Sequence, residues 1–427
     1  MPKTKTAVSS VPGPENITRR ALSNGIVVLA RENFTSPSVV VDCDVRVGAL
    51  WHGREKAGLS DFSAAAMMRG TERYSFDEIY EQIESAAASL SVSGGTHTSG
   101  FYAKCLAEDL DLIMSLAAEA LRRPTFPTDQ VERLRGEILT RLKIHANDTR
   151  SRASEAFYEL AYAGHPYAVD EEGYEDTISA LTRDELAAFH RSHWGPRGMT
   201  VTVVGSIAAE AAMALVEKHF GDWGNASQID QPTLPRVAPL NGLVKRHVPM
   251  PGKSQSDIVL GVPGPARSHP QFLAARLANN ILGVFGMGGR IGHVVRVKGG
   301  MAYYAAASVS GGLGPGAWYA YAGVNPHNVE RAVELIRREI QKVTTRKVTA
   351  AELEDNKAQF IGRMPLSMET NEGVASLVSS MEMFDLGLDY VQRYPDLIRA
   401  ITRDEVLAVA REFLSAEKAA LAVAGPE

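Results

Sequence analysis

The chain has 427 residues, of which 45% are hydrophobic and 22% charged, so it can bury a large core and should divide into two or more domains. This composition excludes disordered, collagen-like and coiled-coil proteins. Forty-five Lys and Arg residues against 50 Asp and Glu residues give a formal net charge of −5, which excludes a global basic field for nucleic acid or an anionic membrane.

Cysteine content and hydropathy narrow the class further. Cys43 and Cys105 are the two cysteines of the sequence, which excludes a disulfide framework or a cysteine zinc site and predicts two buried thiols. No stretch approaches the roughly 20 apolar residues of a membrane-spanning helix, so we expect a soluble chain. Residues 1–16 are polar and lack the apolar middle of a secretory leader. The compartment stays open: cytoplasmic as written, or periplasmic if a leader was removed.

Hydrophobic periodicity predicts both strands and helices along the chain. Apolar residues alternate over 39–47, which predicts a strand with one buried face. Over 110–121 the apolar spacing becomes helical, and Pro124 ends that helix. Three further strands are predicted in the second half of the chain, at 256–262, 301–309 and 317–324.

One segment recurs near the end of the chain. Residues 174–194, YEDTISALTRDELAAFHRSHW, align without a gap with residues 394–414, YPDLIRAITRDEVLAVAREFL. Each copy predicts a helix that begins with a capping box and is followed by a short apolar strand. The chain is therefore predicted to consist of two similar halves, in an α+β fold. Each half is expected to be a mainly antiparallel sheet with helices packed on one face.

A proline-containing stretch of little periodicity separates the two halves, which indicates a surface linker. We place the N-terminal half at 1–224, the linker at 225–242 and the C-terminal half at 243–427.

Residues 57–71, AGLSDFSAAAMMRGT, resemble the signature of the insulinase/pitrilysin (inverzincin) family of zinc peptidases, in its mitochondrial-processing-peptidase-like branch. The family pattern is approximately TGLAHFLEHMLFKGT. The residues that match it are Gly58, Leu59, Phe62, Gly70 and Thr71. The resemblance spans nearly the whole chain, and the duplication agrees with the family's two homologous halves.

The resemblance also locates a degenerate zinc motif. In His-x-x-Glu-His, two histidines bind one zinc ion and the glutamate takes the proton of the metal-bound water. Asp61, Ala64 and Ala65 stand at those three positions. The family's third ligand, a glutamate on a neighbouring helix, falls on Arg141. We therefore expect no zinc in this chain.

Some residues could still imitate a site. Asp61 and Glu137 could leave two carboxylates with weak metal affinity. Two histidine-containing pairs are interpreted as loop or packing residues: His52 with Glu55, and His190 with His193.

Arg296 and Tyr303 resemble the arginine and tyrosine of the family's second half, in a pattern approximately LREKRGLAYSV with the same seven-residue spacing. The resemblance implies that the pair faces the zinc site and helps to hold the scissile carbonyl of a peptide. The alternative is structural: the arginine caps a helix end and the tyrosine fills a strand position. Just upstream, residues 283–291 are glycine-rich but lack the Gly-Lys-Ser/Thr ending of a phosphate loop, so a connection that touches a peptide is the preferred interpretation.

The sequence thus predicts a non-catalytic subunit of a heterodimeric zinc metalloendopeptidase. A homologous partner subunit would carry the zinc, and this chain would form half of the substrate chamber and contribute Arg296 and Tyr303 to binding of an unfolded or extended peptide. Alone, the chain is not expected to be a peptidase. The alternative is a structural core-type or peptide-binding scaffold protein of the same fold. The natural substrate and the choice between homodimer and heterodimer stay open.

Overall fold

The computed structural model describes residues 11–427, so most of the polar N-terminal segment examined for a leader lies outside the described residues. The chain forms two compact units, each assembled from three segments. Unit 1 contains residues 11–139, 171–232 and 364–395, and unit 2 contains residues 140–170, 233–363 and 396–427.

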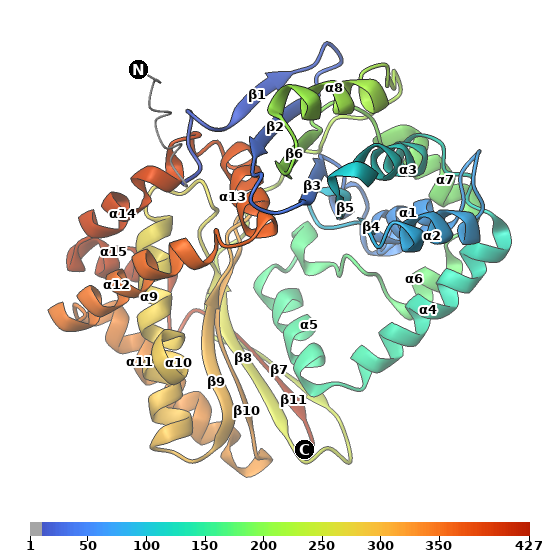
Figure 1. Ribbon diagram of the computed structural model, residues 1–427. Coiled ribbons are helices and arrows are strands. Elements are labelled where there is room, and N and C mark those ends of the chain that lie inside the picture. The colour runs from blue at the N-terminus through green and yellow to red at the C-terminus, as the bar shows by residue number, and fades with distance from the viewer. Residues whose placement is uncertain (1–10) are drawn as a thin grey trace, which may run out of the picture. The chain divides into compact units, whose positions relative to one another are not determined.

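Unit 1 is built on a six-stranded sheet in the order β1-β2-β6-β3-β5-β4 (Figure 1). Its strands are β1 (Thr18–Ala21), β2 (Val27–Glu32), β3 (Ser38–Val45), β4 (Ser89–Ser93), β5 (Ser99–Leu106) and β6 (Thr200–Gly205). The pair β2–β6 is parallel and the other neighbouring pairs are antiparallel. The predicted mainly antiparallel sheet is confirmed in this unit.

The helices of unit 1 cover both faces of this sheet. They are α1 (Leu59–Ala66), α2 (Phe76–Ser85), α3 (Leu110–Arg122), the first part of α4 (Thr128–Ala146), α6 (Glu175–Ala180), α7 (Arg183–His193), α8 (Ala209–Phe220) and α13 (Asn371–Met383). Phe101 of β5 lies against Phe220 of α8, with ring centroids 6.1 Å apart. Asp44, which points to the opposite face, accepts a hydrogen bond of 3.0 Å from Ser379 of α13. One face is therefore packed by helices of the first half, and the other by α13.

Unit 2 repeats this arrangement on a five-stranded sheet in the order β7-β11-β8-β10-β9. Its strands are β7 (Val244–Pro249), β8 (Ser256–Pro263), β9 (Ala302–Val309), β10 (Ala317–Val324) and β11 (Ala420–Gly425). Here β7–β11 is the parallel pair and the remaining pairs are antiparallel. The predicted mainly antiparallel sheet is confirmed in unit 2 as well, although helices contact both of its faces.

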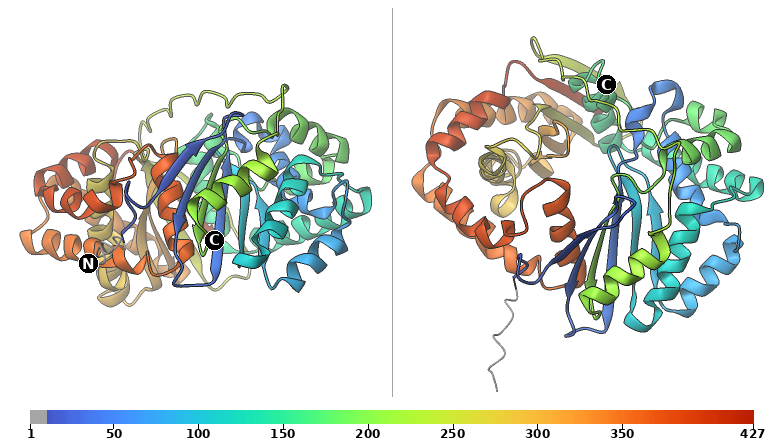
Figure 2. Two further views of the ribbon diagram at one scale, coloured as in Figure 1. Left: turned by 45° about the horizontal axis from the view of Figure 1, so that its top comes forward. Right: turned by 90° about the horizontal axis from the view of Figure 1, so that it is seen from above.

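The helices of unit 2 are α5 (Thr149–Ala161), α9 (Phe272–Gly283), α10 (Phe285–Gly292), α11 (Val329–Thr345), most of α12 (Ala350–Leu366) and α15 (Arg403–Phe413); α14 (Tyr390–Ala400) crosses the unit boundary. Most of them form a layer on one face of the sheet, as Figure 2 shows for the yellow to light orange helices of residues 272–363. Trp318 of β10 donates to Asn279 of α9 on that face (3.1 Å), and Phe157 of α5 packs on Tyr319 of the opposite face, with ring centroids 5.4 Å apart.

The two compact units differ from the halves drawn along the sequence. Segment 140–170, with α5, belongs to unit 2, and segment 364–395, with α13, belongs to unit 1. The two sequence halves therefore exchange one helix each. A boundary drawn at the change in composition does not detect this exchange, because each exchanged helix is continuous with its own half along the chain. The predicted linker 225–242 contains neither helix nor strand.

Several local predictions are confirmed. The repeated helices α7 and α15 both begin with complete capping boxes, formed by Thr182 with Glu185 and by Thr402 with Glu405. Cys43 and Cys105 are buried, and burial raises the pKa of the Cys105 thiol to about 12. Within residues 11–427, no helix combines the length and the apolar content needed to cross a membrane.

Candidate functional site

Helix α1 presents the degenerate motif. It begins after Gly58, whose φ of +88° favours glycine, and its buried side chains include Leu59, Phe62 and Ala64. Asp61 and Ala65 are partly exposed and lie four residues apart, so they share one face of the helix. That face carries a single carboxylate and a methyl group, and the position of the family's general base is the buried methyl of Ala64.

The edge strand β4 runs beside this helix. A Cβ on Gly94, just after β4, would lie 2.7 Å from the Cα of Asp61, so a glycine is required for this close approach. Leu90 and Val92 of β4 are buried, whereas the three serines of the strand are exposed. Within residues 11–427, β4 pairs with β5 on one side and with no strand on the other. An unpaired strand edge therefore adjoins α1.

Glu137 of α4 is engaged elsewhere. Arg69 donates to both of its carboxylate oxygens, at 3.2 and 2.5 Å, and Arg133 approaches it at 3.6 Å. The Arg69 guanidinium holds the pKa of Glu137 below its usual range. Arg141 is exposed, four residues further along α4.

These residues do not fit a zinc ion. Zinc sites in proteins use three or four nitrogen, sulfur or oxygen ligands, and alanine offers none. Asp61 supplies one carboxylate, and the carboxylate of Glu137 already binds a guanidinium. Within residues 11–427, no group of three or more His, Cys, Asp and Glu side chains is placed to hold a metal. No chemical step through zinc is assigned to this chain.

His52, His190 and His193 pack against aromatic side chains. His193 stacks on Phe189, with ring centroids 4.2 Å apart, and lies 6.1 Å from the ring of His52. Burial lowers the pKa of both His52 and His193, so both are neutral at pH 7. His190 is buried against Phe126, and its Nε2 contacts the carbonyl oxygen of Leu121 at 2.8 Å.

Arg296 and Tyr303 lie together in unit 2. Arg296 belongs to a π-helical turn (His293–Val297) that leads into β9, where Tyr303 is the second residue. The guanidinium carbon lies 5.9 Å from the centroid of the tyrosine ring. Tyr303 is 83% exposed, so its ring does not serve the core of the unit. Arg296 is half-buried beside this exposed ring.

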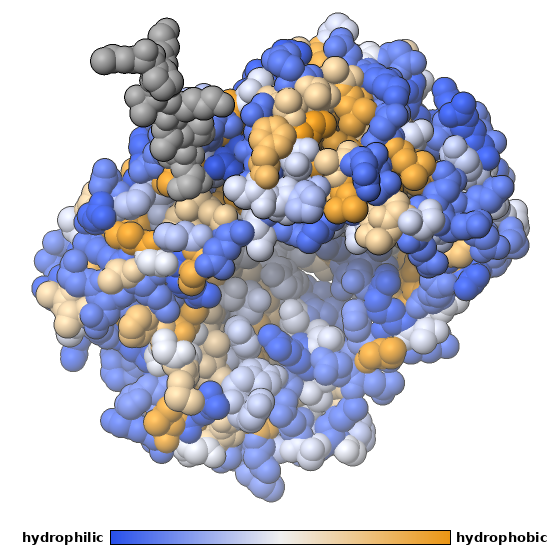
Figure 3. Space-filling model, in the orientation of Figure 1, coloured by the Kyte–Doolittle hydropathy of each residue, from blue (hydrophilic) through white to orange (hydrophobic). Residues whose placement is uncertain are grey.

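The glycine-rich segment packs closely on β9, a role that its sequence did not reveal. A Cβ on Gly288 would lie 2.3 Å from the carbonyl oxygen of Ala305, and one on Gly283 would lie 2.1 Å from the amide nitrogen of Ala307. Asn279 of α9 also donates to the carbonyl oxygen of Ala307 (3.3 Å). This packing covers the backbone of β9. Apolar residues of α10 reach the surface, and Figure 3 shows apolar groups at the place where Figure 1 labels this helix.

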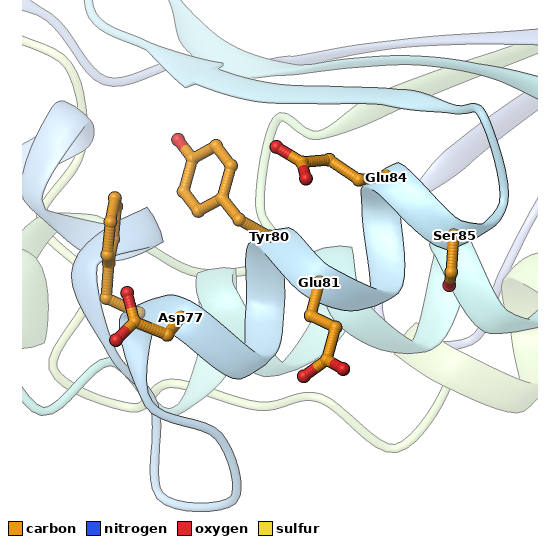
Figure 4. Close-up of a pocket in the computed structure, with 6 residues that line it drawn as sticks. Asp77, Tyr80, Glu81, Glu84 and Ser85 are labelled. Atoms are coloured by element: carbon orange, nitrogen blue, oxygen red, sulfur yellow. The ribbon is translucent and has the colours of Figure 1, made fainter.

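An open groove of about 590 Å³ lies along α2. Its lining residues are Phe76, Asp77, Tyr80, Glu81, Glu84 and Ser85. Figure 4 shows Tyr80 and Glu84 projecting from one side of the helix and Glu81 from another. The acidic residues follow the polar face of an amphipathic helix, which by itself indicates solvation and no chemistry.

Comparison with known proteins places this geometry in a family. An uncharacterized zinc protease of Streptomyces coelicolor is 24% identical over 427 residues, covering 99% of this chain and 93% of that protein. Cytochrome b-c1 complex subunit 1 of Bos taurus mitochondria is 24% identical over 266 residues, covering 61% of this chain and 54% of that protein. A crystal structure of a peptidase M16 inactive domain from Pseudomonas fluorescens shares the fold, with a TM-score of 0.87 and 22% identity over 96% of this chain and 98% of that chain.

Two models of a single family match most of the sequence. The model of insulinase (peptidase family M16) matches residues 27–170, and that of the peptidase M16 inactive domain matches residues 180–360. The chain therefore belongs to the insulinase-like M16 peptidase family.

Proposed function

We propose that this chain is the non-catalytic subunit of a heterodimeric zinc metalloendopeptidase. The observation that carries the proposal is the contrast between two sites. Helix α1 presents Asp61, Ala64 and Ala65, which do not fit zinc, whereas the half-buried Arg296 lies beside the exposed Tyr303. A homologous partner subunit supplies the zinc ion, the attacking water and the general base.

In this proposal, Arg296 and Tyr303 act on the bound peptide. A hydroxyl and a guanidinium that point at a developing oxyanion stabilise it strongly once water is excluded. Neither group needs to change its protonation state for this role. This chain forms half of the chamber, and its contribution to the reaction is positioning of the peptide and stabilisation of charge.

The open edge of β4 is the proposed place for the peptide backbone. An extended segment can add to an unpaired edge through main-chain hydrogen bonds, which makes recognition tolerant of sequence. The three exposed serines of β4 are small, and the strand has no proline or lysine to discourage pairing. The edge of β9 is less suitable, because α9 and the glycine-rich segment cover its backbone.

The proposal is tested with the chain alone and in the presence of a homologous subunit that carries His-x-x-Glu-His. Cleavage of a quenched fluorescent peptide is measured with and without a chelator. We expect no cleavage by the chain alone and chelator-sensitive cleavage by the mixture. Chelator-sensitive cleavage by the purified chain alone contradicts the proposal.

The second candidate is a structural role without proteolysis. The similarity to subunit 1 of the mitochondrial cytochrome b-c1 complex favours it, because that protein is named as a subunit of a larger complex. Purification of the chain from its own cells with its bound partners separates the two candidates. Recovery of a membrane complex, with no zinc-containing homologue, favours the structural role.

A further inference from the structure

We propose that the exposed surface around Arg296 and Tyr303 selects apolar peptide segments that carry an acidic side chain. This surface, the cationic apolar surface, comprises the exposed residues Val284, Phe285, Met287, Val297, Lys298 and Tyr303 together with Arg296. The inference rests on the proposed peptide-binding function and names the class of peptide that this chain favours.

The apolar part of the surface is concentrated in one stretch of chain. Five of the twelve exposed large hydrophobic residues in 11–427 fall between positions 284 and 303. Met287 is 61% exposed and Val297 is 55% exposed. Contiguous exposed apolar residues mark contact surfaces, whereas scattered ones need no explanation. This concentration indicates a surface for apolar side chains of a ligand.

The charged residues in this stretch of the chain are all basic. Residues 284–309 contain Arg290, Arg296 and Lys298 and no Asp or Glu. Arg290 is neutralised by Glu352, with two contacts of 2.8 Å. Within residues 11–427, Arg296 and Lys298 form no ion pair. Two uncompensated cations beside apolar groups complement a carboxylate that is flanked by apolar side chains.

The surface is also held in place before a ligand arrives. Gly283 and Gly288 allow the segment to contact the backbone of β9 at distances that any side chain would block. Arg296 lies over the ring of Tyr303, at 5.9 Å from its centroid. A prearranged surface loses less conformational entropy on binding than a mobile one.

A polypeptide fits these observations better than an anionic membrane. The cations adjoin Tyr303, whose hydroxyl suits a peptide carbonyl, and the chain as a whole carries a net charge of −5, which opposes approach to an anionic bilayer. An acidic side chain is favoured over a chain terminus, because the proposed reaction cleaves within a peptide.

The experiment measures fluorescence anisotropy of labelled ten-residue peptides on the full chain without partner or metal. The peptides share an apolar sequence with two central Glu, Gln or Lys residues, and each has an amidated C-terminus. We expect the Glu peptide to bind about fivefold more tightly than the Gln peptide, and the Lys peptide to bind more weakly than both. Added salt should reduce the difference.

The variant Lys298→Glu tests the surface without changing the Arg296–Tyr303 pair. It should remove the preference for the Glu peptide, whereas Lys418→Glu, an equal charge change at an exposed position of unit 2, should preserve it. Met287→Ser should weaken all three peptides alike. Equal binding of the Glu and Lys peptides, or an unchanged preference in Lys298→Glu, overturns the proposal.

Two further arms complete the test. Binding of vesicles rich in phosphatidylserine but of no peptide would overturn the proposal in favour of a membrane contact. The same peptides are also measured with a free C-terminus, and binding of these alone would overturn the proposal in favour of terminal carboxylates. Because catalysis is not measured, charge-selective binding can persist when no partner restores cleavage. In that case the peptide selectivity is supported, and the proposed role in a heterodimeric peptidase is contradicted.

Discussion

Units 1 and 2 share a strand order but differ in what their equivalent edge strands expose. The series β2-β6-β3-β5-β4 in unit 1 corresponds to β7-β11-β8-β10-β9 in unit 2, and β4 and β9 are the equivalent edge strands. Unit 1 leaves the backbone of β4 open beside α1. Unit 2 covers β9 with glycine-rich backbone and displays side chains instead. The two equivalent edges therefore present different surfaces, backbone at β4 and side chains at β9.

The faces under the exchanged helices differ as well. In unit 2, Asp257 is buried and accepts hydrogen bonds from Thr149, Tyr304 and Gln255. In unit 1, Asp42 is half-buried on the α13 face, and within residues 11–427 no hydrogen bond to its carboxylate is found. A carboxylate without donors in a low dielectric favours its protonated form. The two faces should therefore respond differently to pH.

The largest expected effect is a loss of stability when the packing of the glycine-rich segment on β9 of unit 2 is disrupted. Gly288→Val places a branched side chain at φ +98° and 2.3 Å from the carbonyl oxygen of Ala305. We expect a loss of about 3 kcal/mol in the free energy of unfolding, measured by urea denaturation. Gly300→Val is the control, because Gly300 has φ +61° but no atom within 4 Å of the added Cβ, and it should lose about 1 kcal/mol. Equal losses would show that packing on β9 is unimportant.

The next expected effect concerns Asp42, the half-buried carboxylate of unit 1. Burial, together with the neighbouring Asp44, raises the pKa of Asp42 from 3.8 to about 6. Because the folded pKa exceeds the unfolded value, this group lowers stability as the pH rises from about 4 through 6. Asp42→Asn should therefore stabilise the protein by about 2 kcal/mol at pH 7.5 and by little at pH 4. Urea denaturation at the two pH values measures this difference, and an equal gain at both would contradict the assignment.

A smaller effect is expected at the side-chain surface of unit 2. Tyr303→Phe removes one hydroxyl from a ring that is 83% exposed. Turnover by the reconstituted complex should fall about tenfold, because Arg296 remains as a donor, while the unfolding free energy stays unchanged. Steady-state cleavage assays and urea denaturation check the two statements. Unaltered turnover would remove the hydroxyl from the mechanism.

The smallest expected effect concerns a feature that the two units share, the capped N-terminus of the equivalent helices α7 and α15. Thr182→Ala and Thr402→Ala each remove the hydroxyl that caps an equivalent helix, α7 or α15. Each should lower the unfolding free energy by about 1 kcal/mol. Thr182→Ser and Thr402→Ser keep the hydroxyl and serve as controls. A difference of more than about twofold between the two alanine variants would mean that the repeats have diverged in their energetics.

The sequence predicted those features that depend on local chemistry. Capping boxes, strand alternation and the 174–194 repeat are properties of short segments, so the helices, the sheets and the duplication could be read directly. The exchange of α5 and α13 could not, because hydrophobic periodicity tells which face of a helix is buried but not which sheet covers it. The ion pair of Arg69 with Glu137 was missed for a similar reason, since its partners are 68 residues apart.

The glycine-rich segment also shows the difference between features set by local sequence and features set by tertiary contacts. Gly283–Ile291 was noticed for its composition, and a contact with peptide was the preferred interpretation. The close approach of Gly283 and Gly288 to β9 depends on a strand that follows later in the chain. For the candidate site, the resemblance located Asp61, Ala64, Ala65, Arg296 and Tyr303, while the exposure of the tyrosine ring required coordinates.

The exchanged helices constrain how the protein can be made. The sheet of unit 1 is complete in sequence by Gly205, yet the helix that covers its second face begins at Asn371. During synthesis the ribosome must add more than a third of the chain before that sheet can bury its exposed side, so the nascent N-terminal half passes through an aggregation-prone interval. Cutting the chain in the linker would likewise leave each fragment with a bare sheet face, and expression of either half alone should yield insoluble protein.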